Sequence, residues 1–403
     1  MVGVSHISLK KELHIIGGGS AALFLAALLD PEKYRVHVYE KNKALGRKFL
    51  VAGQGGFNLT HSEPPELFKT RYREAFLGDL FLKHDNAVFR SWLKSLGIET
   101  VIGSSRRVYP AKGIKPIEVL NAIERKLEEN SVLLHFSHTF YGWDETNRLI
   151  FEVNGERKYI TAETTVLALG GASWRVTGSD GGWQEYVASK GIHVVPFQSS
   201  NCAFRIEWPE PVKERLAGEA IKNALFSCGN MQHAGEAVIT DFGIEGSGVY
   251  PLSEEVRRAL RDKKFAEILI DFKPQKTLSD LTTLLQNKLY KNITEALREG
   301  VKLSDSAILL LKTFLTKEMF TNATTLAANI KAFPLTVSDV APLDQAISTV
   351  GGISMDEITD SFELKKMPGV YAIGEMLDWD APTGGYLLQM CYSMAAEVAE
   401  RMR

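Results

Sequence analysis

The sequence predicts an α/β fold in which a parallel sheet begins near the N-terminus and is completed near the C-terminus. The first observation is a βαβ pattern in under thirty residues, with an apolar strand at 13–16, three glycines, an apolar helix at 21–29 and a β-rich strand at 35–40. The second is a strand-like run at 370–373 that ends in glycine and precedes a closing helix at 386–403. Strands alternating with helices at both ends indicate one sheet built from distant parts of the chain.

The composition is that of a globular protein with room for two or three domains. The 403 residues are 45% hydrophobic and 24% charged, and 47 basic against 49 acidic residues give a net charge of −2. This balance carries no overall nucleic-acid signal, and the first ten residues lack the apolar core of a signal peptide. Cys202, Cys228 and Cys391 form no Cys-x-x-Cys pair, which argues against a disulfide framework or a zinc site. We therefore expect a cytoplasmic protein without a metal or a membrane segment.

The middle of the chain changes character twice. A helix is expected at 116–130, and a strand at 165–169 ends in a further glycine pair, Gly170-Gly171. From about 195 to 250 short strands alternate with turns, whereas 277–332 carries helical patterns with little strand signal. These shifts predict a β-rich module and a helical module between the two ends of the first sheet.

The N-terminal glycines form a dinucleotide-binding motif. Gly17, Gly19 and Ala22 occupy the three small positions of a G-x-G-x-x-G/A pattern, which allow a tight turn, a close approach to a pyrophosphate and helix–strand packing. The helix that starts there offers free N–H groups to the phosphates. Glu40, 18 residues after Ala22, ends the second strand where an acid accepts the ribose hydroxyls. An unphosphorylated ribose, as in FAD or NAD, is therefore favoured over that of NADP.

The C-terminal motif favours FAD over NAD. Gly374-Glu375 follows the strand at 370–373, and Pro382-Thr383-Gly384-Gly385-Tyr386 opens the last helix. A reduced flavin carries negative charge at its N1/C2=O edge, and a helix N-terminus stabilises such charge. Alone, Gly384-Gly385 reads as a simple turn; combined with the N-terminal motif it predicts a flavin. The glycine-rich loop 53–61 either passes backbone amides across a cofactor face or is a mobile surface loop.

Several single residues remain open between a functional and a structural role. Tyr109 and Lys112, with Arg106 and Arg107, form a basic aromatic loop. It either meets a substrate or a nicotinamide donor, or is a proline-braced turn with solvated charges. His61, in the glycine-rich loop, is either an acid–base group or a hydrogen-bonded structural residue. Trp174 and Arg175, after Gly170-Gly171, either edge the flavin or pack in the core. For Asp378 and Asp380, before the last helix, turn formation is favoured over a role beside the flavin. No catalytic residue is assigned.

In these motifs the chain resembles the HI0933-like (YhiN/BaiN-type) FAD-dependent oxidoreductase family over nearly its whole length. The matching passages are IIGGGSAA, AGQGGFNLTH, RVYPAKG, LALGGASWRVTGSDG, ITDFGIEGSG, VGGIS and GVYAIGEMLDWDAPTGGYLLQ, of which the last is the most specific. Two departures weaken inferences about chemistry. Gly56-Phe57 stands where many relatives have Arg-Cys, and 244–248 replaces a commoner Ser-Gly-Pro pattern.

The resemblance implies a Rossmann-type FAD-binding domain at 1–195 and 350–403, a β-barrel domain at 196–274 and 333–349, and a helical domain at 275–332 inserted in the barrel. It also implies cofactor-binding roles for the motif residues, at the pyrophosphate and ribose, the middle of the cofactor and the flavin side. The candidate set is Gly17, Gly19, Ser20, Ala21, Ala22, Glu40, Lys41, Lys48, Gly53, Gln54, Asn58, Phe140, Gly170, Gly171, Gly374, Glu375, Thr383, Gly384, Gly385 and Tyr386.

Three functions follow as hypotheses. The first is an FAD-dependent oxidoreductase whose flavin takes hydride at N5 from NAD(P)H or a small organic substrate. The second is an RNA-modifying flavoenzyme that reduces uridine in ribosomal RNA. Residues 251–331 hold 14 basic and 10 acidic residues, and this charge of +4 either binds RNA phosphates or belongs to a solvated helical face. Lys263, Lys264, Lys288 and Lys291 would then contact RNA. The third is a flavin-binding redox sensor without turnover.

Overall fold

The computed structural model describes residues 10–51, 57–287 and 289–403. The chain divides into two compact units, Met1–Gln198 with Ser348–Arg403, and Ser199–Ile347. The division of the second unit into a barrel and a helical domain stays a prediction.

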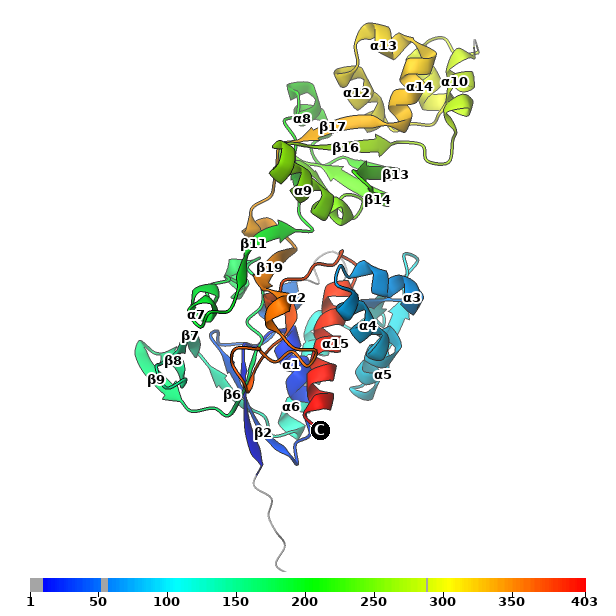
Figure 1. The fold of residues 1–403 in the computed structure, drawn as a ribbon. Coiled ribbons are helices and arrows are strands. Elements are labelled where there is room, and N and C mark those ends of the chain that lie inside the picture. The colour runs from blue at the N-terminus through cyan, green and yellow to red at the C-terminus, as the bar shows by residue number, and fades with distance from the viewer. Residues whose placement is uncertain (1–9, 52–56, 288) are drawn as a thin grey trace, which may run out of the picture. The chain divides into compact units, whose positions relative to one another are not determined.

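The first unit is built on a five-stranded parallel sheet. Its strands are β20 (Val370–Ala372), β10 (Thr164–Leu167), β1 (Lys11–Ile16), β2 (Tyr34–Glu40) and β6 (Leu133–Phe136), in that order across the sheet. Figure 1 labels β2 and β6, with α1, α6 and α15 nearby. Each neighbouring pair is parallel. Because parallel strands end at the same edge, the segments that follow these strands come together. The predicted α/β class with a parallel sheet is thereby confirmed.

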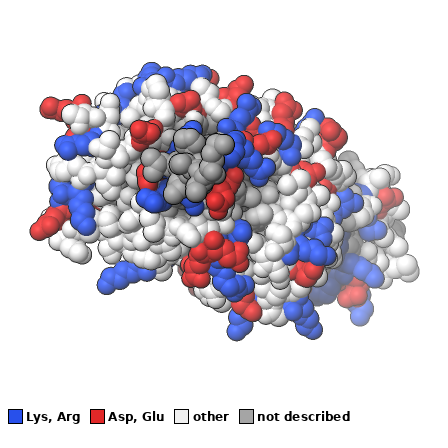
Figure 2. Space-filling view, turned by 90° about the horizontal axis from the view of Figure 1, so that it is seen from below, with Lys and Arg blue, Asp and Glu red and all other residues white. Residues whose placement is uncertain are grey.

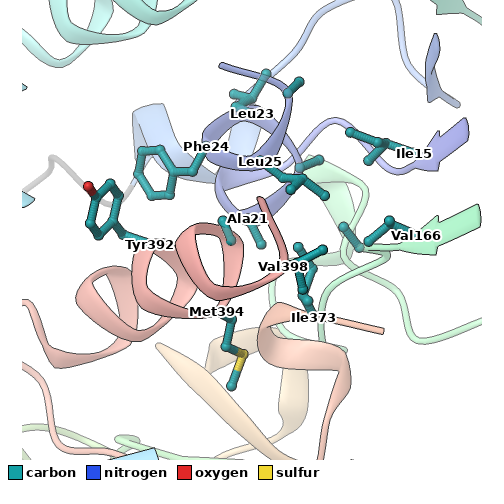
Figure 3. Packing of buried hydrophobic residues seen from close by; sticks show 14 of the residues in the cluster. Ile15, Ala21, Leu23, Phe24, Leu25, Val166, Ile373, Tyr392, Met394 and Val398 are labelled. Atoms are coloured by element: carbon teal, nitrogen blue, oxygen red, sulfur yellow. The ribbon is translucent and has the colours of Figure 1, made fainter. Parts of the chain in front are cut away.

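Helices cover one face of this sheet and a small antiparallel sheet contacts the other. The helices are α1 (Ser20–Leu28), α6 (Pro116–Glu129) and α15 (Tyr386–Arg401). In α1 seven residues from Ala21 to Ala27 are buried, because the helix packs against both the sheet and α15 (Figure 3). On the opposite face Phe151 of β8 stacks on Tyr39 of β2, with ring centroids 4.6 Å apart. The small sheet consists of β7 (Thr139–Trp143), β8 (Leu149–Val153) and β9 (Glu156–Ile160), and Asn154-Gly155 forms its predicted hairpin turn.

A second antiparallel sheet, β3–β5–β4, and short helices complete the first unit. The strands of this sheet are β3 (Thr60–His61), β4 (Thr100–Ile102) and β5 (Arg107–Pro110). The helices are α2 (Arg47–Val51), α3 (Pro65–Phe68), a 3₁₀ turn at Lys69–Arg71, α4 (Ala75–Lys83), α5 (Asn86–Ser95) and α7 (Gln184–Ala188). Strand β19 (Ser348–Ile353) pairs with β11 (Val194–Ser200), which runs across the boundary between the units.

The second unit combines a seven-stranded antiparallel sheet with helices that share its core. The strand order is β17 (Phe333–Val337), β16 (Ala266–Asp271), β13 (Ala220–Cys228), β14 (Met231–Ile239), β15 (Gly243–Glu245), β12 (Phe204–Arg205) and β18 (Asp339–Val340). Because β17 and β18 are the two edge strands and only Ser338 separates them, the sheet curves back on itself.

The helices of this unit are α8 (Glu210–Leu216), α9 (Ser253–Lys263), α10 (Leu278–Gln286), α11 (Ile293–Glu295), a π-helical turn at Ala296–Gly300, α12 (Asp305–Phe314), α13 (Lys317–Thr321) and α14 (Ala323–Lys331). One buried cluster joins sheet residues such as Phe226 and Ile268 to helix residues such as Leu281 and Leu311. The helices are thus packed on the sheet rather than on each other alone.

Two whole-chain features bear on partners. Within the described ranges, none of the helices is long and apolar enough to cross a bilayer. On the face shown in Figure 2, basic and acidic side chains are interspersed, in keeping with the nearly balanced net charge.

Candidate cofactor site

Four of the predicted signatures meet at the carboxyl edge of the parallel sheet. Gly17 follows β1, Glu40 ends β2, Gly170 follows β10 and Gly374 follows β20. In the sheet order β10 and β20 lie on one side of β1, whereas β2 lies on the other, so the chain reverses its direction of winding beside β1. Ligands of open α/β sheets bind in the crevice at such a point.

The turn between β1 and α1 requires a glycine at position 17. Gly17 has φ +112°, and a Cβ on it would lie 2.3 Å from the main-chain oxygen of Ala168, so a side chain fits neither the conformation nor the space. At Gly19, the residue before α1, a Cβ would meet nothing within 4 Å, and no side chain caps the helix there. The first-turn N–H groups, from Ser20 to Ala22, lack intrahelical acceptors and suit a pyrophosphate.

Glu40 connects this turn to the loop after β2. Its Oε2 accepts a hydrogen bond from the Gly18 amide at 2.8 Å, and its Oε1 accepts from the amide and side-chain nitrogens of Asn42 at 2.8 and 2.6 Å. The ammonium of Lys41, the residue after Glu40, pairs with Asp180 at 2.7 Å. An open hollow beside this loop is lined by Lys41, Asn42, Lys43, Ala44, Arg47 and Ser137.

An ion pair lies where β10 and β20 end. The Lys48 ammonium donates to Glu375 and to the hydroxyl of Ser173, each at 2.7 Å. The other Glu375 oxygen accepts from the Thr349 amide at 3.0 Å. Gly171 must be small here, since a Cβ would lie 2.1 Å from the Thr349 hydroxyl and 3.0 Å from the Glu375 carboxyl carbon. Three sequence-predicted residues, Lys48, Gly171 and Glu375, are thus brought together.

Two buried tryptophans, which the sequence did not single out, hold the glycine turns. The indole N–H of Trp183 donates to the Gly170 carbonyl at 2.9 Å, and that of Trp379 donates to the Gly374 carbonyl at 2.8 Å. Both glycines have positive φ, +73° and +82°. A Cβ on Gly374 would lie 3.0 Å from the Cβ of Ala21, so the C-terminal glycine turn contacts the start of α1. No local pattern marks an indole as the partner of a distant carbonyl.

The N-terminus of α15 packs against the last residues of the glycine-rich loop. Gly384 and Gly385 have φ +126° and +98°, and a Cβ on Gly385 would lie 2.5 Å from the Cα of Thr60. The Thr60 hydroxyl donates to Gln389 of α15 at 2.7 Å. Half-buried Asn58 lies two residues before Thr60 and is therefore part of the same segment. Gly53 and Gln54 lie outside the described residues.

The Tyr386 side chain is buried in a polar network. Its hydroxyl donates to Glu63 at 2.6 Å, and its ring stacks on His61 with centroids 5.2 Å apart. Arg71 binds both oxygens of Glu63, at 3.0 and 2.8 Å. Burial opposes the charge on Glu63, but the hydrogen bonds from Arg71 and Tyr386 hold the pKa of this carboxyl below its usual value. Burial, and then hydrogen bonding to Glu63, raise the pKa of Tyr386.

His61 is held as a neutral ring. Its Nδ1 accepts from the Glu63 amide at 3.1 Å, so Nε2 carries the proton and donates to the Ser105 carbonyl at 3.2 Å. Burial is the largest cause that lowers its pKa. With both nitrogens occupied, His61 is a positioning residue in this structure rather than a free acid or base.

The remaining candidate residues from the sequence lie in the aromatic core or in the loops near α15. The Phe140 ring is buried against Trp143, Phe151 and Tyr186 in the small antiparallel sheet, so the side chain belongs to the core. Thr383 is half-buried beside Gly384. Of the two acids before the last helix, Asp380 accepts from the amide of the next residue, Ala381, at 2.9 Å, a contact local to its turn. Asp378 instead accepts from the amide of Gly351 in β19 at 3.0 Å, so it ties the loop before α15 to a strand that lies earlier in the chain.

This combination of sheet order and glycine turns is that of an α/β protein of the Rossmann type. The chain belongs to the family described as "HI0933-like protein Rossmann domain", which matches residues 11–401, and the family is one of FAD-dependent oxidoreductases. The resemblance predicted from the motifs is therefore confirmed.

Curated relatives and solved structures extend over nearly the whole chain. A 3-dehydro-bile acid Δ(4,6)-reductase of Clostridium scindens is 24% identical over 94% of this chain and 96% of its own length. A ribosomal RNA dihydrouridine synthase of Haemophilus influenzae is 24% identical over the same shares. The structure of 3-ketosteroid-Δ4-(5α)-dehydrogenase from Rhodococcus jostii aligns with a TM-score of 0.53 at 14% identity, covering 98% of both chains, which shows a shared fold.

Proposed function

We propose that this chain is an oxidoreductase that binds FAD at the carboxyl edge of the parallel sheet. The observation that carries the proposal is the meeting of Gly17, Glu40, Gly171 and Gly374 at that edge. A Cβ on Gly17 would collide with the Ala168 main chain, and a Cβ on Gly171 with the Thr349 hydroxyl. Bound FAD supplies the transfer of hydride to and from flavin N5. NAD(P)H or a small organic substrate is the proposed source of that hydride.

The residues take distinct roles toward this cofactor. The first turn of α1 offers its free N–H groups to the pyrophosphate, and Glu40 accepts the ribose hydroxyls. Lys48 places a positive charge, compensated by Glu375, near the middle of the cofactor. The N-terminus of α15 stabilises negative charge at the flavin pyrimidine ring, because its first N–H groups lack a side-chain cap.

The relatives suggest the kind of compound that receives the hydride. One is a bile acid reductase, and the other forms dihydrouridine, which is uridine with its ring double bond reduced. We propose that this chain also reduces a carbon–carbon double bond conjugated to a carbonyl group.

The variant Gly17→Ala tests the cofactor site. Its Cβ would collide with the Ala168 carbonyl, so purified protein should lose most of its bound FAD, measured by flavin absorbance per chain. Gly155→Ala is the matched control: Gly155 also has positive φ, +85°, but a Cβ there meets nothing within 4 Å. Wild-type protein that binds no FAD when it is supplied would refute the proposal. Reduction of the bound flavin by NADH or NADPH and its re-oxidation by an acceptor would exclude a redox sensor without turnover.

A lysine cluster in the second unit supports RNA as an alternative substrate. Lys273, Lys276 and Lys302 lie close together, and burial followed by the charges of the other two lowers the pKa of Lys273. Such crowding of like charge is relieved by phosphates. Of the lysines considered from the sequence, Lys263, Lys264 and Lys291 are exposed, and Lys288 lies outside the described residues.

The RNA alternative predicts salt-dependent binding through this cluster. If Lys276 and Lys302 each contact one RNA phosphate, neutralising both should make the slope of log affinity against log salt concentration shallower by about 1.4 for single-stranded RNA. Lys213→Gln on α8 serves as the control in fluorescence anisotropy titrations. An unchanged slope in the double variant would remove the support that this cluster gives.

A further inference from the structure

Arg107 and Tyr109 share one face of the β3–β5–β4 sheet. Along β5 the side chains alternate, with Val108 and Pro110 buried on one face and Arg107 and Tyr109 half-buried on the other. The Tyr109 ring lies under Gly103, where a Cβ would be 3.0 Å from its Cε2. The exposed face of this strand therefore presents a guanidinium next to an aromatic ring.

The guanidinium lies at the start of α15. Its Nε is 3.7 Å from the position that a Cβ on Gly384 would take. In the antiparallel register Arg107 is directly opposite His61, whose ring stacks on Tyr386. Arg107 thus reaches the part of the cofactor site that the proposed function gives to the flavin pyrimidine ring.

The charge of Arg107 is uncompensated. Among the residues that the structure describes, no carboxylate pairs with it and no side-chain hydrogen bond engages it, whereas its neighbour Arg71 binds both oxygens of Glu63. A half-buried cation without a partner carries a desolvation cost that an anionic or carbonyl oxygen would relieve. The N–H groups of α15 add positive potential at the same place.

We propose that Arg107 binds the carbonyl or carboxylate oxygen of a planar substrate, with the Tyr109 ring beside the substrate's apolar part. The proposal rests on the proposed function for its location at the flavin, but not for the binding itself. A guanidinium suits this task, because it presents several N–H donors in one plane and stays charged at all physiological pH values. An oxygen held there becomes more negative as the attached double bond accepts hydride, so the same contact assists the reduction.

The adjacent Arg106 provides a matched control. It is exposed, and its main-chain carbonyl, which accepts the amide and hydroxyl hydrogen bonds of Ser62, stays in place when the side chain is changed. Arg107→Gln and Arg106→Gln remove the same charge from neighbouring positions. A long-range electrostatic effect would affect both variants, whereas a direct contact affects only the first.

The experiment titrates benzoate, a planar ring with a carboxylate, into the full chain by isothermal calorimetry, with and without added FAD. Arg107→Gln should weaken benzoate binding about ten- to hundredfold, Arg107→Lys less, and Arg106→Gln less than about twofold. The melting temperature of Arg107→Gln should not fall, since an unpaired cation is removed; a residue with a merely structural role would lower it.

Equal losses in the two Gln variants, or no benzoate binding by the wild-type chain at millimolar concentrations, would overturn the inference. Flavin absorbance of the same preparations tests the proposed function separately. A chain that binds benzoate through Arg107 but no FAD would refute the proposed function and leave the oxygen site standing.

Discussion

Acidification should loosen the parallel sheet through His14. This ring is 6% exposed, stacks on His37 with centroids 4.9 Å apart and lies 3.2 Å from the Tyr39 hydroxyl. His37 in turn contacts His135 at 2.9 Å and Glu12 at 2.7 Å. Three imidazoles on adjacent strands β1, β2 and β6 cannot all gain a proton without repulsion.

The size of the effect follows from the pKa of His14. Burial, then the charge of His37, lower this pKa from 6.5 to about 4, while Glu12 opposes the change and His135 adds to it. The unfolded chain therefore binds a proton at a higher pH than the folded chain does. Stability is fully present above pH 6.5 and falls as the pH drops toward 4. The loss is about 2 kcal/mol by pH 5 and about 3 kcal/mol below pH 4.

The assay compares wild-type protein with His14→Phe at pH 8 and pH 5. Since two compact units need not unfold together, hydrogen–deuterium exchange of β1 amides reports the local free energy of opening better than a global transition. Wild-type β1 should lose about 2 kcal/mol more than the variant, in which a neutral aromatic ring keeps the stack. Exposed His193, changed to Asn, is the control. Equal losses in wild type and His14→Phe would refute the reasoning.

Three further substitutions test other parts of the structure. Gly385→Ala should separate α15 from β3 and reduce FAD retention severalfold in absorbance measurements, whereas Gly113→Ala, with a similar φ of +97° but open space around it, should not. Glu63→Gln leaves Arg71 without its carboxylate and should lower stability by about 2 kcal/mol in urea titrations, a loss that should shrink at acid pH as wild-type Glu63 itself becomes protonated. Leu311→Ala should lower the free energy of unfolding of the second unit by about 3 kcal/mol and leave the FAD content per chain unchanged. An unchanged unfolding free energy would contradict the core that the helices and the sheet share.

The parts of the site that local spacing determines were predictable from sequence. Gly17 and Glu40 follow their strands at fixed offsets, and the structure places both at the carboxyl edge of the sheet. Gly374 was recognised in the same way, because the strand before it has a clear apolar pattern.

The residues that sequence reasoning missed have partners far away in the chain. Glu63 meets Tyr386 across 323 positions, and no periodicity marks an acid after a glycine-rich loop as the partner of a helix-start tyrosine. Trp183 and Trp379 look like ordinary core residues until their N–H groups are seen to donate to glycine carbonyls. Conversely, Phe140 carries no local signal that separates a cofactor contact from the aromatic core in which its ring is buried.

The position of β20 and α15 after the second unit in the chain has a consequence during synthesis. Helix α1 is apolar on nearly all sides, and its partner α15 is synthesised only after the whole second unit. Residues 199–347 are complete earlier and form a compact unit of their own. Until α15 has been synthesised, the nascent first unit therefore exposes an apolar helix, and its parallel sheet lacks the edge strand β20.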